Sequence, residues 1–253
     1  MPRTYSTEAV VLGSHKLGDA DRIVTLFTRD HGKTPTVVKG VRKIRSRFGG
    51  RLEPFTHLNV QLHEGRNLHT LTSADTIRTH AALRDNPESL RAGLAFVDML
   101  GRATAEVERR PRTFNLVINY LDVMEKLNSE DTGAASGSSA ARQGLISTTL
   151  GAELKLLMLT GFLPHLANCA SCGTANSLPR FSAQAGGALC ENCGGESFEV
   201  SGPALEIMRR LLEKPLSESA STTLTMETAS EVWSCIREIC RYHLGVDLKV
   251  KPW

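Results

Sequence analysis

The chain has 253 residues, with 30 lysines and arginines against 27 aspartates and glutamates, so its formal net charge is only +3. Hydrophobic residues make up 41% and charged residues 23%, which excludes a disordered, collagen-like or coiled-coil chain. No apolar run reaches the roughly 18 residues of a membrane helix, and the start MPRTYSTEAV lacks the apolar core of a secretory signal. We therefore expect a cytoplasmic protein with no membrane partner.

The charge is distributed unevenly along the chain. Residues 1–80 carry 13 lysines and arginines against 7 acidic residues, whereas residues 81–253 carry 17 against 20. Six of the eight histidines also fall within the first eighty residues. Such an asymmetry is expected when one domain binds a polyanion. We therefore predict two domains, residues 1–80 and residues 81–253.

Residues 1–80 have the pattern of a small all-β domain. Short runs rich in valine, leucine, threonine and phenylalanine predict strands at residues 5–12, 22–28, 34–39, 55–63 and 68–74. Turn-forming glycine, aspartate and asparagine residues separate these runs. Five strands in this length predict an oligonucleotide-binding (OB) barrel, with sandwich and SH3-like barrels as competing folds.

From residue 85 onward the apolar residues follow the period of helices. Pro87 and Pro111 are expected near the starts of two helices, and further helices are predicted at residues 146–160, 201–212 and 226–244. The stretch at residues 129–141, rich in serine, glycine and alanine, predicts a flexible loop. The predicted fold class is α+β: an N-terminal OB-fold barrel followed by a helical domain containing a cysteine module at residues 166–200.

Four cysteines form two CxxC pairs, Cys169 with Cys172 and Cys190 with Cys193, and 17 residues separate the pairs. This spacing is typical of a site in which four thiolates hold one zinc ion. Between the pairs, residues 181–189 predict a strand, a glycine-rich turn and a second strand, which would bring the pairs together. Because four thiolates close the coordination sphere, we expect a structural zinc and not a catalytic one.

Other interpretations of the cysteines are weaker. Two disulfides would need an oxidising compartment, and a redox CxxC pair normally sits in a βαβ context that this sequence lacks. The remaining Cys235 and Cys240 lie five residues apart in the last predicted helix. We expect them to be core residues, because a free cysteine behaves as a small hydrophobe.

The segment at residues 39–51 contains six basic residues and no acidic one. A basic segment beside an OB groove is typical of proteins that bind single-stranded nucleic acid. A solvated charged loop without a function is the alternative. Within the segment, Phe48 could either stack on a base or anchor the segment to the barrel. The candidate DNA-binding residues are Lys39, Arg42, Lys43, Arg45, Arg47 and Arg51, with Arg22 and Lys33 from the neighbouring strands, and Arg66 as a possible extension.

The sequence contains no catalytic constellation. Gly32-Lys33-Thr34 resembles the end of a P-loop, but Phe27 stands where the first glycine is required. No HxE motif accompanies the cysteines, so the zinc-deaminase signature is absent. We therefore expect a protein that is not an enzyme. On the residues alone, a zinc-ribbon adaptor that binds RNA or an acidic protein remains the alternative to a DNA-binding protein.

Several segments match a known family when they are taken together. In the first domain they are GDADRIVTLFT at residues 18–28, KGVR at 39–42, SRFG at 46–49 and LEPF at 52–55. In the second they are LKLL at 154–157, GFLP at 161–164 and the FS and GG pairs within 181–187, which precede the two cysteine pairs. The chain resembles the RecO family of bacterial recombination-repair mediators over nearly its whole length. Residues 129–141 match no segment of that family and are interpreted as an insertion.

The resemblance implies a non-enzymatic function in recombinational DNA repair, in the RecF pathway. Proteins of this family have an N-terminal OB-fold, a helical domain and often a four-cysteine zinc module. They bind single- and double-stranded DNA and anneal complementary strands. They act with RecR to load RecA onto DNA coated with single-stranded-DNA-binding protein, whose C-terminal tail they contact. The resemblance thus implies DNA, RecR and that tail as partners, RecA as an indirect one, and a nucleoid-associated location.

Overall fold

The computed structural model describes residues 4–42, 46, 48–65, 68–105, 108–130 and 139–253. Four of the basic residues singled out above, Lys43, Arg45, Arg47 and Arg66, lie outside the described residues. So does most of the loop predicted at residues 129–141. The chain divides into two compact units, Met1–Asp85 with Thr104–Asp122, and Asn86–Ala103 with Val123–Trp253. The domain boundary near residue 80 stays a prediction.

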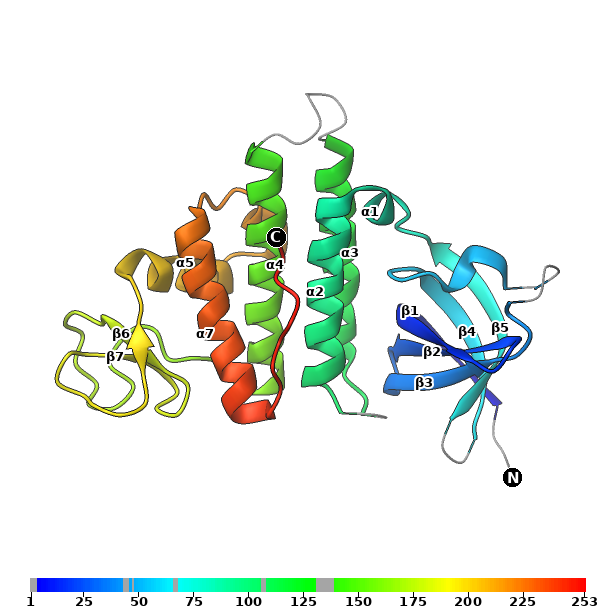
Figure 1. The fold of residues 1–253 in the computed structure, drawn as a ribbon, viewed down its shortest axis with the longest axis horizontal. Helices are drawn as coiled ribbons and strands as arrows, with labels where there is room; N and C mark the ends of the chain where they lie inside the picture. Colours follow the sequence, from blue (N-terminus) through cyan, green and yellow to red (C-terminus); the bar gives the residue numbers. More distant parts are fainter. Residues whose placement is uncertain (1–3, 43–45, 47, 66–67, 106–107, 131–138) are drawn as a thin grey trace. The chain divides into compact units, whose positions relative to one another are not determined.

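The first unit is built on a closed five-stranded barrel (Figure 1). Its strands are β1 (Thr4–Leu17), β2 (Asp21–Thr28), β3 (Gly32–Val38), β4 (His57–His63) and β5 (His69–Arg78). They follow the order β1-β2-β3-β5-β4, and β4 pairs with β1 to close the ring. Within this ring, β3 and β5 pair in parallel, and the other neighbouring strands pair antiparallel. This topology is OB-like, and the predicted fold class is confirmed.

Strand β1 closes the barrel because it pairs along both of its edges. Its residues 4–10 pair with β4, and its residues 9–17 pair with β2. The register with β2 shifts between Val11 and Gly13. An irregularity of this kind bends a strand and increases its twist, so that one strand can belong to both sides of a ring.

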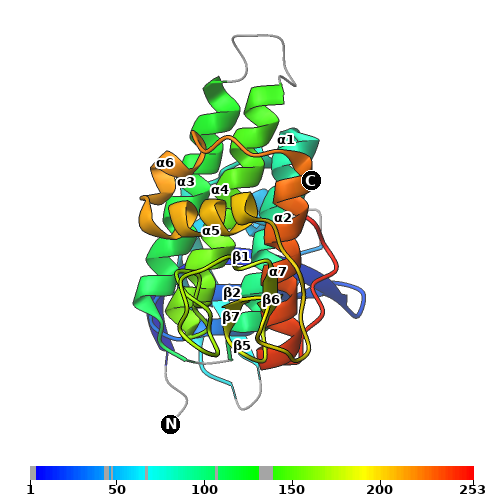
Figure 2. The same ribbon diagram turned by 90° about the vertical axis from the view of Figure 1, so that its left-hand side faces the viewer.

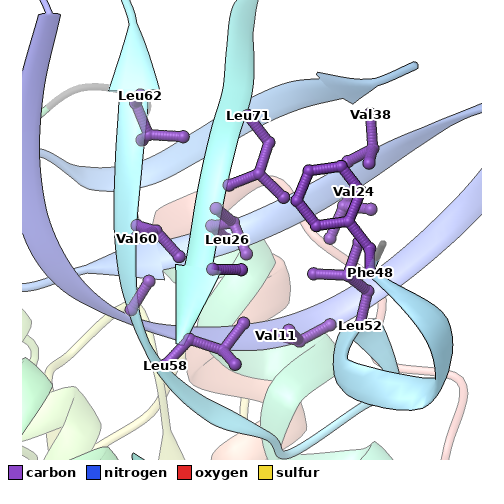
Figure 3. Close-up of a cluster of buried hydrophobic side chains, with 12 residues drawn as sticks. Val11, Val24, Leu26, Val38, Phe48, Leu52, Leu58, Val60, Leu62 and Leu71 are labelled. Atoms are coloured by element: carbon purple, nitrogen blue, oxygen red, sulfur yellow. The ribbon is translucent and has the colours of Figure 1, made fainter. Parts of the chain in front are cut away.

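Alternating burial along the strands fills the barrel with apolar side chains. Every second residue of β3 is buried, which is the period of a strand with one face in a core. The core cluster contains Ala9, Val11, Val24, Leu26, Val38, Phe48, Leu52, Leu58, Val60, Leu62, Leu71 and Ala74 (Figure 3). Phe48 and Leu52 come from the short 3-10 helix η1 (Gly49–Leu52) and the residue before it. Since Phe48 is only 3% exposed, it anchors the basic segment to the barrel and does not offer a base a stacking face.

The first turns of helix α3 (Pro111–Glu130) pack on the barrel within the first unit. The ring of Phe114 is fully buried and lies parallel to that of Phe27, with 6.5 Å between ring centroids. The guanidinium of Arg29 lies 5.0 Å from the centre of the Phe114 ring and bonds to Glu8 at 3.1 Å. Glu8 also pairs with His57 at 3.0 Å, although burial lowers the pKa of that imidazole. The sequence pattern gave no sign that these helical residues pack on the barrel.

The second unit is a helical bundle with a small sheet (Figure 2). Its helices are α2 (Pro87–Ala103), the end of α3, α4 (Ser139–Thr160), α5 (Gly202–Glu213), α6 (Leu216–Ser219) and α7 (Met226–Leu244). The four-residue α1 (Ala82–Asp85) belongs to the first unit and ends its first segment. Its sheet has the order β7-β6-β8, from β6 (Arg180–Ser182), β7 (Gly187–Leu189) and β8 (Phe198–Glu199). None of the described helices is long and apolar enough to cross a membrane.

The ends of α7 show why its bounds could be predicted. The Thr225 hydroxyl accepts a hydrogen bond from the Thr228 amide at the start, and Gly245 adopts a positive φ of 66° at the end. Both are common helix-capping signals that a sequence displays. By contrast, α4 begins at Ser139, seven residues before its predicted start, because its first turns lack an apolar period. The predicted burial of Cys235 and Cys240 in α7 is confirmed.

Glu153 lies in the middle of α4 with only 1% of its surface exposed. Its Oε2 atom has no hydrogen-bond partner among the described residues. Burial raises the pKa of this carboxyl from 4.5 to about 8. Burial also raises the pKa of the nearby Cys240 thiol to about 12, and a charge on Glu153 would add to that effect. Glu153 is therefore protonated at neutral pH.

Truncating Phe48 should destabilise the barrel. We expect Phe48→Ala to lower the free energy of barrel opening by about 3–5 kcal/mol, because a large buried ring is lost and a cavity remains. Hydrogen exchange of the β2 and β3 amides measures this opening, with the exposed Leu17→Ala as the matched control. Unchanged protection in the Phe48 variant would contradict the anchoring role.

Glu153 should make the stability of the helical bundle pH-dependent. Between pH 4.5 and about 8 the unfolded chain releases the proton of Glu153 while the folded chain keeps it. The free energy of unfolding should therefore fall as pH rises through this window. In Glu153→Gln, which has no proton to release at this position, the free energy of unfolding should fall less over the same pH range. Urea unfolding followed through Trp233 and Trp253, both in the second unit, measures the difference. Parallel pH profiles for the two proteins would refute the assignment.

Candidate nucleic-acid interface and metal centre

Basic residues from three parts of the first unit lie at one end of the barrel. Lys16 of β1 pairs directly with Arg22 of β2, and Arg22 pairs on its other side with Val38 at the end of β3. Lys39 follows Val38, and the amide of Arg42 donates to the carbonyl oxygen of Ala20 at 3.0 Å. The strand register and this turn bond therefore bring the backbones of Arg22, Lys39 and Arg42 to the same end of the barrel, and their function in DNA binding stays a prediction. The strand register also adds Lys16, which strand pairing alone could have identified.

Two of the predicted DNA-binding arginines also hold the backbone in place. Arg42 Nη1 donates to the carbonyl oxygens of Gly18 and Asp19, at 3.3 and 3.0 Å, and so fastens the β1–β2 turn. Arg51 Nη1 donates to the carbonyl oxygen of Ala74 at 3.1 Å and ties η1 to β5. A guanidinium has five N–H donors, so these bonds leave further donors for a phosphate.

Acidic side chains also lie at this end of the barrel, which the basic segment alone does not reveal. Asp21 accepts a hydrogen bond from the Gly40 amide at 2.8 Å. Glu53 pairs with Arg22 at 3.8 Å, and both side chains are partly exposed. An exposed pair of this kind contributes little to stability, so Arg22 can exchange Glu53 for a phosphate at small cost.

Lys33 is not part of this group. It pairs with Phe27, near the opposite end of the β2–β3 ladder from Arg22. Five residues along a strand correspond to about 17 Å. Only a ligand that follows β2 and β3 along their length would meet both ends of this ladder.

The four cysteines of the second unit converge on one point. Their sulfur atoms all lie within 4.8 Å of one another, and Cys172 and Cys190 are 3.7 Å apart. That separation is too long for a disulfide, and all four cysteines are free. Four sulfurs at about 2.3 Å from a tetrahedral zinc would be about 3.8 Å apart, close to the spacing seen. The geometry therefore fits a metal ion with four thiolate ligands.

Local backbone structure shapes each half of this cluster. The Gly173 amide donates to the carbonyl oxygen of Cys169 at 2.9 Å, and Gly173 has a positive φ of 77° that favours glycine. In the second half, the Cys193 amide donates to the carbonyl oxygen of Cys190 at 3.3 Å. The paired strands β6 and β7 bring the two halves together, as the sequence predicted.

The thiols differ in acidity. Hydrogen bonds from the backbone of Cys190 and Cys172 lower the pKa of Cys169 to about 6. For Cys193, a hydrogen bond with Ser171 lowers the pKa, but the contacts with the other three sulfurs raise it to about 12. The thiolate is the form of cysteine that binds metal, so the lowered pKa of Cys169 favours metal binding.

Comparisons with known proteins cover both parts of the chain. The family described as "Recombination protein O N terminal" matches residues 1–80, and the one described as "Recombination protein O C terminal" matches residues 141–252. The first match contains the barrel with its basic end, and the second contains the four cysteines. Residues 81–140 lie between the two matches.

Curated relatives match most of the chain. A protein named DNA repair protein RecO from Rubrobacter xylanophilus is 36% identical over 223 residues, which cover 86% of this chain and 84% of the relative. Proteins of the same name from Nocardioides sp. and Roseiflexus sp. are 42% and 33% identical, over 75% and 97% of this chain. These matches cover 74% of the Nocardioides protein and 83% of the Roseiflexus protein.

Proposed function

Because the chain belongs to the RecO family of DNA repair proteins, we propose that it is a non-enzymatic DNA-binding protein of recombinational repair. The observation that carries the proposal is the match of both parts of the chain to this family. An OB-like barrel with basic residues at one end supports it. The protein would act on chromosomal DNA in the cytoplasm.

The proposed interface consists of Lys16, Arg22, Lys39, Arg42 and Arg51, together with Lys43, Arg45 and Arg47 of the same basic segment. These side chains would neutralise phosphates and release counterions, with little preference for sequence. Neutralising the phosphates of two complementary strands also lowers the repulsion that opposes their annealing. This step forms and breaks no covalent bond, so it needs neither ATP nor a catalytic residue.

We also propose the partners that family membership suggests. The protein would bind single- and double-stranded DNA, RecR and the C-terminal tail of single-stranded-DNA-binding protein. It would thereby assist the loading of RecA without being the recombinase itself. The metal of the four-cysteine cluster would be one zinc ion held by Cys169, Cys172, Cys190 and Cys193. With four protein ligands its function would be to hold the two halves of the module together.

Removing charge from the basic segment should weaken DNA binding and its salt dependence. We expect the triple variant Lys43→Ala, Arg45→Ala, Arg47→Ala to reduce the magnitude of the log–log salt slope for single strands by about 2, at about 0.7 per phosphate contact. A salt titration with a fluorescent oligothymidylate measures the slope, and an annealing assay without ATP tests the consequence.

The matched control is Arg102→Ala, Arg210→Ala, Lys249→Ala, which removes the same charge from exposed positions of the second unit. If both triple variants change the salt slope equally, the effect comes from the net charge of the protein and the proposed DNA interface is refuted. If polyglutamate competes as well as DNA does, the protein is an adaptor for acidic partners.

The variant Arg42→Lys distinguishes the two functions of Arg42, which are charge and support of the β1–β2 turn. It keeps the positive charge but loses the forked bonds to the carbonyl oxygens of Gly18 and Asp19.

The zinc proposal predicts about one equivalent of zinc in the purified protein. Cys169→Ser should abolish metal binding and destabilise the second unit, whereas Ser177→Ala, at an exposed position between the two cysteine pairs, should keep the metal. Acidification should release the zinc, because protons compete for the thiolates. Elemental analysis and thermal unfolding measure both effects. Full zinc content in Cys169→Ser, or no zinc in the unmodified protein, would contradict the proposal.

A further inference from the structure

The small sheet of the second unit ends in a strand with one open edge. The outer edge of β7 is covered, because His165 pairs with Gly187. On the other side of the sheet, β8 pairs only with β6 among the described residues. The Val200 amide donates inward to the carbonyl oxygen of Pro179 at 2.9 Å. Because successive residues of a strand direct their backbone groups to opposite sides, the N–H and C=O of Glu199 point away from β6.

This open edge is short and has a defined end. The amide of Ser201, two residues beyond Glu199 and therefore also directed outward, donates to the carboxylate of Glu231 at 2.6 Å. For the outward N–H of Glu199, the described part of the chain supplies no such acceptor. An added strand could therefore pair with residues 197–199 but no further toward α5.

Hollows flank β8 on both faces of the sheet. One, the aromatic hollow, has a volume of about 230 Å³. Its lining combines the rings of Phe181, Phe198 and Tyr242 with polar residues, among which Arg241 is bound to Glu238 and Glu196. The other is a more open hollow of about 1010 Å³, lined by Arg180 and by the carboxylates of Glu191, Glu199 and Glu231. The pairing of Phe181 with Phe198 and of Arg180 with Glu199 explains the two faces, because neighbouring residues alternate sides.

We propose that the β8 edge binds an extended segment of a partner protein in which apolar and basic residues alternate. The backbone of that segment would pair with Glu199 as an added strand, a common mode of peptide recognition. Its apolar side chains would enter the aromatic hollow on one face. Its lysines or arginines would meet Glu191, Glu199 and Glu231 on the other. The same carboxylates repel phosphate, so a nucleic acid does not suit this surface.

The shape of the edge favours recognition over mere protection. Natural sheets often guard an exposed edge by making it short and charged, and β8 has both properties. Protection alone does not require a hollow with three aromatic rings on the face opposite Glu191, Glu199 and Glu231. The open hollow is lined by three carboxylates and one arginine, which gives it an excess of negative charge for a basic ligand.

Fluorescence anisotropy with short synthetic peptides tests the proposal on the full-length protein. The probe is a peptide of alternating lysine and valine, and the comparison probe replaces each lysine with glutamate. We expect the lysine peptide to bind and the glutamate peptide not to bind. The double variant Glu191→Gln, Glu199→Gln should weaken its binding about tenfold, as expected for the loss of two exposed ion pairs. The double variant Glu213→Gln, Glu218→Gln, at exposed positions that line neither hollow, should leave it unchanged.

A proline substitution at position 199 distinguishes the contribution of backbone pairing to peptide binding from the contribution of charge. Glu199→Pro removes an outward N–H but no hydrogen bond to β6, so it should weaken binding about fivefold beyond Glu199→Gln. Equal binding by Glu199→Pro and Glu199→Gln would overturn the added strand. Equal binding of the two peptides would overturn the basic partner. If the protein dimerises and Glu199→Pro abolishes the dimer, the edge binds a second copy of this chain instead. Since the edge contains none of the proposed DNA-binding residues, these outcomes are independent of the DNA-binding tests.

Discussion

The first unit depends on the way the basic segment is fixed to the barrel at both of its ends. At one end, the Gly40 amide bonds to Asp21, next to the β1–β2 turn. At the other, Phe48 and Leu52 are buried in the barrel core and Arg51 bonds to β5. Burial of two large apolar side chains contributes several kcal/mol, whereas each surface ion pair contributes less than about 1 kcal/mol. The charges can therefore serve a ligand, because the apolar anchors hold the segment.

Most of the fold could be predicted from the sequence, because its signals are local. The period of two within β3 and the capping residues of α7 each lie within a few positions of the element that they define. The two CxxC pairs are equally local, and a strand pair was enough to join them. The start of α4 was missed because residues 139–145 have no apolar period of their own, although they are helical.

The remainder depends on contacts between residues far apart in the chain. The packing of Phe114 on Phe27 and Arg29 joins positions more than eighty residues apart, and no period indicates it. The acidic neighbours of the basic segment, Asp21 and Glu53, likewise become visible only through strand register and ion pairing. Neither the net charge of the chain nor the number of basic residues in the segment at residues 39–51 describes the charge at this end of the barrel, because both leave out these acidic neighbours.

The central claim is that DNA meets the barrel at the end where the β1–β2 turn and the basic segment lie. Hydrogen–deuterium exchange with and without a saturating oligothymidylate tests it most directly, because every peptide of the chain is observed at once. DNA bound at this end should slow exchange in residues 13–22 and 39–52 and leave exchange in residues 180–199 unchanged. Protection confined to the second unit, with the barrel unchanged, would contradict it.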